Sequence, residues 1–156
     1  MNLYLISVGT KMPRWIEDGF NEYAKRMPSE ARLKLIEIPS GHRGKRSDLA
    51  RAVRDEGDRM LKAVPRHCLV VALEIKGRPW TTEQLSGRLE SWMSDGRDIA
   101  FMIGGPDGLA DGCLRQAEIR WSLSPLTMPH PLVRIVVAEQ LYRAWSLLRN
   151  HPYHRA

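Results

Sequence analysis

The sequence predicts a single α/β domain built on a mostly parallel sheet with helices on both faces. Short apolar segments alternate with segments whose apolar residues recur at helical spacing, and this alternation is typical of a parallel sheet. The third strand-like segment opens with a nearly continuous apolar run, as expected when both faces of a sheet are covered. The chain has 156 residues, which suits one domain over residues 1–156.

The first half of the chain contains two of these strands and two helices. The strands are expected over residues 3–8 and 33–38, where short apolar runs end at a glycine or a proline. A helix begins at Pro13 and ends at Pro28, because proline fits the first turn of a helix but cannot continue one. The second helix follows a basic, glycine-rich loop over residues 40–46.

The second half contains three strands and three helices in alternation. The strands are expected over residues 68–75, 99–103 and 120–123, and the helices from residue 81, over 111–117 and over 132–148. Thr81 and Gln84 match a capping box, in which two side chains satisfy amides of the first helical turn. The last helix is apolar over most of its circumference, so it is either a central core helix or a dimer helix. We favour the dimer helix.

The composition indicates a basic protein with a polyanionic partner. The formal net charge is +6 and the isoelectric point is about 9.7. Such a charge favours nucleic acid as the partner over a merely soluble basic protein. Cys68 and Cys113 have no metal-ligand spacing and form no disulfide framework, so we expect a reducing cytoplasm and no metal. The apolar run over residues 3–8 is too short for a signal or membrane segment.

Three strand ends carry the residues from which a ligand site could be built. Open α/β sheets bind ligands beyond the carboxyl ends of their strands. Here those ends are residues 73–77, 104–105 and 123–128, which together suit an adenosine better than a triphosphate. The paired glycines at 104 and 105 would let a ligand approach the backbone, although a plain strand-to-helix turn has the same signature.

The C-terminal third is rich in groups that could move a proton or bind phosphate. Histidines stand at 130, 151 and 154, and a histidine near neutral pKa can transfer protons, although most single histidines are structural. Arginines and tyrosines around them could form a surface for RNA phosphates and bases, which the basic loop would extend. The alternative is an ordinary solvated charged face.

Several longer motifs occur in order along the whole chain. They are Val-Gly-Thr-Lys from residue 8, Ile-Gly-Gly-Pro from 103, Trp-Ser-Leu-Ser from 121, Pro-His-Pro-Leu-Val-Arg from 129, Ala-Glu-Gln-Leu-Tyr-Arg-Ala-Trp-Ser from 138 and Asn-His-Pro-Tyr-His-Arg from 150. With these motifs the chain closely resembles the SPOUT-class methyltransferases of large-subunit ribosomal RNA.

The resemblance implies more than spacing alone can. It implies a SPOUT fold with a C-terminal trefoil knot, a homodimer, and S-adenosylmethionine as cofactor. It also implies methyl transfer to N3 of a pseudouridine in 23S ribosomal RNA, within the assembled ribosome. A non-catalytic ribosome-binding factor with this fold and a SPOUT enzyme of transfer RNA are the alternatives.

The resemblance and the residue types together assign the candidate site. The cofactor-binding positions are Leu73, Gly104, Leu123, Ser124, Pro125, Leu126, Thr127 and Met128. The candidate catalytic residues are Arg134 and Arg155, as cations that stabilise a developing anion, and His130 and His154, as proton acceptors. The candidate RNA-binding residues are Arg43, Lys45, Arg46, Tyr142 and Tyr153.

Overall fold

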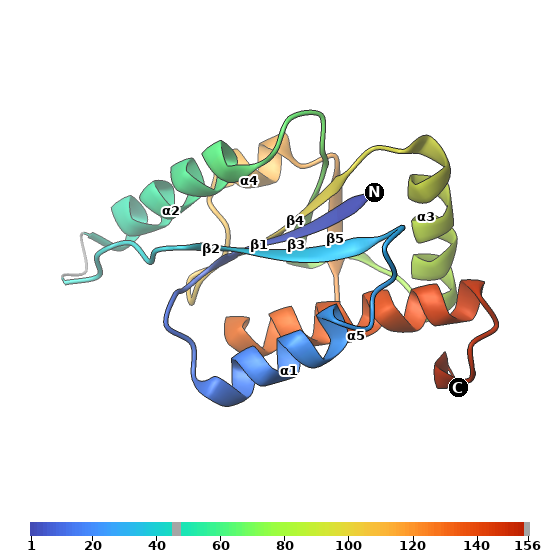
Figure 1. Ribbon diagram of the computed structural model, residues 1–156. Coiled ribbons are helices and arrows are strands. Elements are labelled where there is room, and N and C mark those ends of the chain that lie inside the picture. Colours follow the sequence, from blue (N-terminus) through green and yellow to red (C-terminus); the bar gives the residue numbers. More distant parts are fainter. Residues whose placement is uncertain (45–47, 155–156) are drawn as a thin grey trace.

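The computed structural model describes residues 1–44 and 48–154 and contains a five-stranded, wholly parallel sheet (Figure 1). The strands are β1 (Asn2–Val8), β2 (Arg32–Ile38), β3 (Leu69–Pro79), β4 (Ile99–Ile103) and β5 (Ile119–Ser122). Their order across the sheet is β2-β1-β4-β3-β5, so β4 lies between β1 and β3. The predicted α/β class and parallel sheet are confirmed, whereas the C-terminal knot stays a prediction.

Helices cover both faces of this sheet (Figure 1). They are α1 (Arg14–Ala24), α2 (Leu49–Ala63), α3 (Thr82–Asp95), α4 (Asp111–Gln116) and α5 (His130–Leu148), followed by the short 3₁₀ helix η2 (Pro152–His154). α1, α3 and α5 pack on one face, and α2 and α4 on the other. Connections that cross the sheet in opposite directions place their helices on opposite faces, as a single crossover handedness requires.

The alternation of side chains along β1 shows how the two layers of core are formed. Leu3 and Leu5 point into the layer beneath α1, α3 and α5, whereas Ile6 and Val8 point toward α2 and α4. All five residues of β4 are buried. Both faces of the central strands are therefore covered, as their apolar sequences predict.

β3 extends further than the sequence suggests. It runs to Pro79, and its pairing with β5 shifts register between Leu73 and Arg78. The bulge bends β3 away from β5, and the indole of Trp80 beyond it stacks on Trp121 of β5 with ring centroids 4.9 Å apart. The extension depends on β5, which lies far along the chain, so local sequence could not predict it.

α5 is a core helix on one side and is partly exposed on the other. Val137, Ala138, Leu141 and Ala144 are buried against the sheet and the neighbouring helices α1 and α3. Other apolar residues of α5, such as Leu132, are only half-buried. The helix thus contributes to the core of its own chain and keeps apolar surface for a further contact.

Candidate functional site

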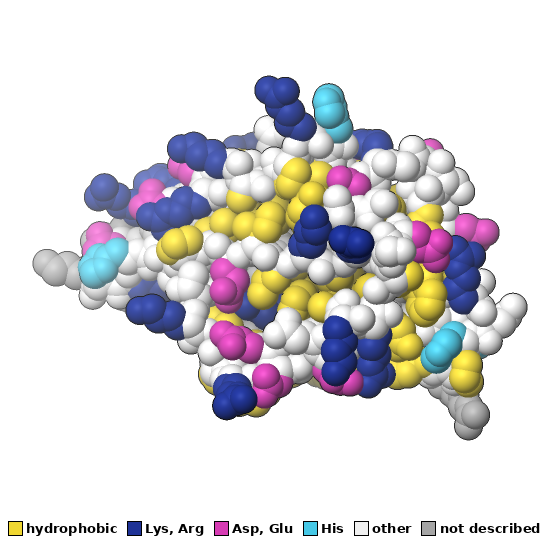
Figure 2. All heavy atoms as spheres, in the orientation of Figure 1, with side chains coloured by type: hydrophobic (Ala, Val, Ile, Leu, Met, Phe, Trp, Pro, Cys, Tyr) yellow, Lys and Arg dark blue, Asp and Glu magenta, His cyan; other side chains and the backbone are white. Residues whose placement is uncertain are grey.

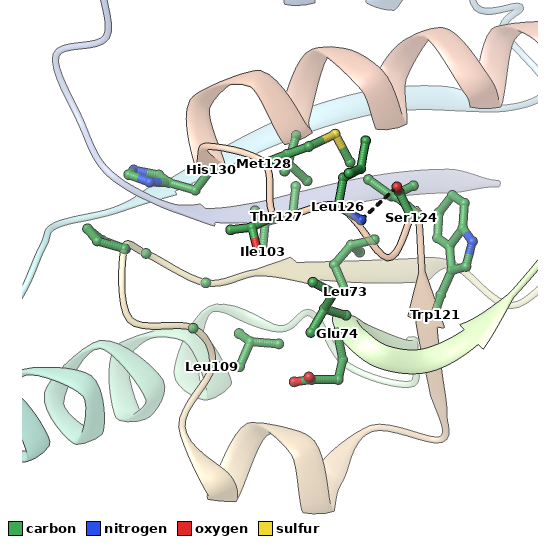
Figure 3. A pocket seen from close by; sticks show the side chains of 17 residues that line it. Leu73, Glu74, Ile103, Leu109, Trp121, Ser124, Leu126, Thr127, Met128 and His130 are labelled. Atoms are coloured by element: carbon green, nitrogen blue, oxygen red, sulfur yellow. Dashed lines mark hydrogen bonds between the residues drawn. The ribbon is translucent and has the colours of Figure 1, made fainter.

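A cavity of about 240 Å³ lies where β3 bulges away from β5 and where β4 and β5 end (Figure 3). It is lined by Leu73, Glu74, Ile75, Ile103, Gly104, Gly105, Pro106, Gly108, Leu109, Trp121, Leu123, Ser124, Leu126, Thr127, Met128, His130 and Val133. In Figure 3, Leu126, Thr127 and Met128 lie on one side of the cavity, opposite Glu74 and Leu109. The cavity therefore brings together the three strand ends that the sequence indicates. Of the predicted cofactor positions, all except Pro125 line it.

The loop between β5 and α5 is held in shape by its own hydrogen bonds and prolines. The hydroxyl of Ser122 donates to the carbonyl of Ser124 at 3.2 Å, and the hydroxyl of Ser124 accepts from the amide of Leu126 at 3.0 Å. Prolines in the loop fix further backbone torsions. These bonds and prolines restrict the loop, so it would lose little conformational entropy when a ligand binds.

Gly104 lies at a close approach of two backbone segments at the end of β4. A Cβ atom at this position would lie 2.5 Å from the carbonyl carbon of Gly108. Gly105 and Gly108 form a bridge that closes the turn back on itself. A side chain at 104 would force this turn open, so the turn depends on glycine there.

The cavity walls are mainly apolar and carry little positive charge. Among residues 1–44 and 48–154, no lysine or arginine lines the cavity, and its ionisable side chains are Glu74 and His130. Ile75 and Leu126 at its edge are 46% and 74% exposed, which leaves apolar surface for a ligand or partner to cover. Such a lining disfavours a polyphosphate and suits a ligand with apolar and cationic parts.

Among the described residues, His130 is the histidine that lines the cavity. It begins α5, next to Gly9, whose φ of 112° places the backbone in a region that favours glycine. Burial lowers the pKa of His130 below its usual value, and the charges of Arg134 and Arg43 lower it further, although Glu56 opposes them. The imidazole is therefore neutral at physiological pH and can accept a proton.

Arg134 is buried rather than displayed to solvent. Its side chain is 1% exposed and donates to the carboxylate of Glu37 at 2.8 Å. A second guanidinium nitrogen donates to the hydroxyl of Ser7 at 3.2 Å and to the carbonyl of Gly9 at 3.3 Å. Arg134 thus fixes the start of α5 against the ends of β1 and β2, and it does not line the cavity.

The tail folds back onto the middle of α5. The hydroxyl of Tyr153 donates to Glu139 at 2.9 Å, and its ring lies 4.6 Å from that of the buried Tyr142. Burial and the neighbouring Glu139 raise the pKa of Tyr153 above its usual value. Glu139 lies about 13 Å further along α5 than His130. His154 is accordingly absent from the cavity lining of its own chain, and Arg155 lies outside the described residues.

Arg43 is held in an ion-pair network. Its guanidinium contacts the carboxylates of Glu56 and Asp107. Lys45 and Arg46, the other candidate RNA-binding residues of this loop, lie outside the described residues. Figure 2 shows further lysine and arginine side chains over this end of the molecule, interspersed with acidic ones.

Sequence reasoning did not single out several residues of the site. Trp121 and Leu109 line the cavity, and Glu56 is buried beside it at 2% exposure. Glu74 was signalled by its place at a strand end next to Leu73. The signal for Glu56 is its place on the apolar face of α2, where an acidic residue is unusual. The sequence does not indicate which residues it would contact.

The fold and the cavity are those of an α/β protein that binds a small organic molecule beyond the ends of its strands. A family model described as "Predicted SPOUT methyltransferase" matches residues 1–154. The chain therefore belongs to the SPOUT methyltransferase family, which makes it an enzyme of the methyltransferase class.

Full-length similarity to a curated protein agrees with this family. The chain is 58% identical over 155 residues to the ribosomal RNA large subunit methyltransferase H of Thioalkalivibrio sulfidiphilus, and the match covers 99% of both chains.

Two solved structures share the fold at low identity. A protein from Legionella pneumophila described as a "putative methyltransferase", solved with SAM bound, is 11% identical with a TM-score of 0.51, and the match covers 93% of this chain and 66% of that one. A protein from Porphyromonas gingivalis described as a "probable rRNA-methyltransferase" is 14% identical with a TM-score of 0.54, and the match covers 95% of this chain and 69% of that one.

Residues 1–44 and 48–154 contain neither a metal-ligand cluster nor a membrane-spanning helix. No three histidine, cysteine, aspartate or glutamate side chains gather there in a way that could hold a metal ion. No helix in this part of the chain combines the length and apolar character needed to cross a bilayer.

Proposed function

We propose that this chain is an S-adenosylmethionine-dependent methyltransferase that acts on N3 of a pseudouridine in large-subunit ribosomal RNA. Supporting this are the full-length, 58% identical relative and the cavity at the strand ends. The observation that carries the proposal is the lining of that cavity. It is mainly apolar, without a described lysine or arginine, and it contains a histidine whose pKa is lowered.

The lining fits S-adenosylmethionine in shape and charge. Leu73, Leu109 and Leu123 offer apolar walls for an adenine ring, and the backbone of the turn at Gly104 can be approached closely. The carboxylate of Glu74 favours a cationic ligand. When bound, the cofactor supplies an electrophilic methyl group on a positively charged sulfur.

The residues of the chain would align the target nitrogen and remove its proton. His130 lines the cavity as a neutral imidazole, so it would accept the proton of the ring N–H directly or through one water. Arg134 would act as a positioning residue, because its charge is buried and paired with Glu37. It fixes the helix start that carries His130. Alignment of this kind can supply several kcal/mol of the barrier.

We also propose that the enzyme is a homodimer with sites near the subunit contact. Trp15 on α1 is 62% exposed and α5 keeps half-buried apolar side chains, which a second copy would cover. The described part of the tail, which ends at His154, does not line the cavity of its own chain. A catalytic part for His154 would therefore require the partner's cavity.

A mixed-dimer experiment tests this arrangement. Chains carrying His130→Ala and His154→Ala are coexpressed with two different tags, and heterodimers are purified. If the tail acts on the partner's cavity, the heterodimer contains one site with both histidines and regains about half of the wild-type rate. If it acts within one chain, each site keeps one defect and activity is not regained. Each variant homodimer serves as the control.

The substrate would be the assembled ribosome in the cytoplasm. The net charge of +6 suits ribosomal RNA, and Tyr142 is too deeply buried in its own chain to stack on a base without rearrangement. Recognition would therefore depend on the shape and charge of a ribosomal surface.

Methylation assays decide between this function and its alternatives. Ribosomes from a strain without the gene are incubated with the enzyme and labelled cofactor, and the modified nucleotide is mapped by mass spectrometry. We expect one methylated pseudouridine in the large-subunit RNA, and much slower reaction on naked RNA. Methylation of free transfer RNA would refute the substrate. Absence of cofactor binding in calorimetry would favour a non-catalytic ribosome-binding factor.

A further inference from the structure

The carboxylate of Glu56 joins parts of the molecule that lie far apart in the sequence. Glu56 belongs to α2 and is 2% exposed. Its Oε2 accepts from the amide of Gly41 at 2.8 Å, and its two oxygens accept from both terminal nitrogens of Arg43. Glu56 thus holds residues 41–43 of the basic loop against the body of the protein.

Arg43 continues this network to the turn beside the cavity. Its Nε donates to Asp107 at 2.9 Å, and Asp107 lies in the turn between β4 and α4. A Cβ atom at Gly105, in the same turn, would lie 3.4 Å from Oε1 of Glu56. The network therefore supports the turn 104–108 through Asp107 and beside Gly105. Glu56, Arg43 and Asp107 do not line the cavity themselves.

The charges make the three residues depend on one another. A buried carboxylate is costly unless a cation and hydrogen bonds satisfy it, and removing one partner of such a pair leaves the other charge unpaired. Arg43 has only 23% of its side chain exposed, so the guanidinium is held by two carboxylates rather than by water. Displacement of Arg43 would release both the loop and the turn.

We propose that Glu56 is a positioning residue that, through Arg43 and Asp107, fixes the cavity turn 104–108 and ties it to the basic loop. The affinity for S-adenosylmethionine then depends on side chains that do not touch it. This inference rests on the proposed use of the cavity for that cofactor. The rival view is that Arg43 only contacts RNA phosphate, in which case its removal would leave cofactor affinity unchanged.

Calorimetric titration of S-adenosylmethionine, without RNA, separates these two views. Arg43→Ala and Asp107→Asn are each expected to raise the Kd for the cofactor by roughly three- to thirtyfold, because they act on one network. The double variant is expected to be no weaker than the weaker single variant. Arg43→Lys should recover part of the affinity. Arg54→Ala removes the same charge from an exposed position of α2 and should keep the wild-type Kd.

Hydrogen exchange of the cofactor-free protein gives a second readout. In Arg43→Ala, the amide of Gly41 and the amides of residues 104–108 are expected to exchange faster together, whereas Arg54→Ala leaves both unchanged. Faster exchange confined to residues 41–44, or a wild-type Kd in Arg43→Ala, would overturn the proposal. If the wild-type chain itself binds no cofactor, the proposed function fails, and the exchange experiment still tests the coupling between loop and turn.

Discussion

At the scale of single residues, the protonation of His130 connects the local structure to the chemistry. Burial and the neighbouring Arg134 disfavour the imidazolium, and Arg43 adds to this, while Glu56 opposes it. The lowered pKa keeps the side chain uncharged at neutral pH. A neutral ring beside the cavity would not repel a cationic ligand and has a lone pair available for a proton.

The pH dependence of methylation should therefore reflect His130. We expect kcat/KM to fall on acidification with a midpoint below 6.5, the usual value for histidine, because the native side chain takes up its proton only at lower pH. Acidification through this range also favours the unfolded chain, in which histidine binds a proton more readily. His130→Gln should be slow and lack this acid limb. An NMR titration of the imidazole measures the pKa directly, and a value above 6.5 would contradict the prediction.

Gly104 should be irreplaceable for cofactor binding. In Gly104→Ala, the new methyl group meets the backbone of Gly108, so the turn must open and the Kd for S-adenosylmethionine should rise by roughly tenfold or more. Gly87→Ala is the matched control, because no atom lies within 4 Å of a Cβ there. It lies within α3 and should raise the free energy of unfolding by about 0.5–1 kcal/mol with unchanged affinity. Equal affinity in both variants would refute the close-approach argument.

At the scale of elements, features that depend on neighbouring residues could be predicted from the sequence, whereas features that depend on distant segments could not. The capping box at the start of α3 is formed as the sequence predicts, because Thr81 and Gln84 need only one another. The start of α5 at His130, rather than near 132, and the extension of β3 to Pro79 depend on packing against remote segments. Sequence reasoning located the elements and missed these ends.

The capping box gives a prediction for stability. Thr81→Ala removes the hydroxyl that accepts from the amide of Gln84 at 3.1 Å, and should lower the free energy of unfolding by about 1 kcal/mol. Ser94→Ala, at an exposed position near the other end of α3, should change it by less than about 0.5 kcal/mol. Urea denaturation followed by circular dichroism measures both. A loss in Ser94→Ala as large as in Thr81→Ala would show that capping is not the cause.

At the scale of the whole molecule, the sequence predicts where the candidate site lies, but it does not predict the ion pairs and hydrogen bonds around the site. Leu73, Gly104 and the loop over 123–128, apart from Pro125, line one cavity, as the rule that ligands lie beyond strand ends predicts. The ion pairs of Arg43 could not be foreseen, because Glu56 and Asp107 lie 13 and 64 positions away. The burial of Arg134 likewise depends on Glu37, which is 97 positions away.

The net charge of +6 should make ribosome binding sensitive to salt. Release of counterions from RNA phosphates predicts that affinity for the large subunit falls by roughly tenfold or more between about 50 and 200 mM salt. Filter binding at several salt concentrations measures this. Cofactor affinity, measured in the same buffers, should change little because the cavity is mainly apolar. Salt-independent binding to ribosomes would indicate recognition without phosphate contacts.

The central position of β4 has a consequence for synthesis of the chain. β1 and β2 are neighbours in the sheet and are translated first, but the strands that flank β3 are β4 and β5, which are translated after it. β4 ends at residue 103, so until that residue has left the ribosomal exit tunnel β3 has no partner strand. The core that buries Val71 in the folded protein is then still incomplete. The nascent chain should therefore stay protease-sensitive through most of its translation. The chain would become protease-resistant late in translation, when β4 inserts between β1 and β3 and completes the sheet.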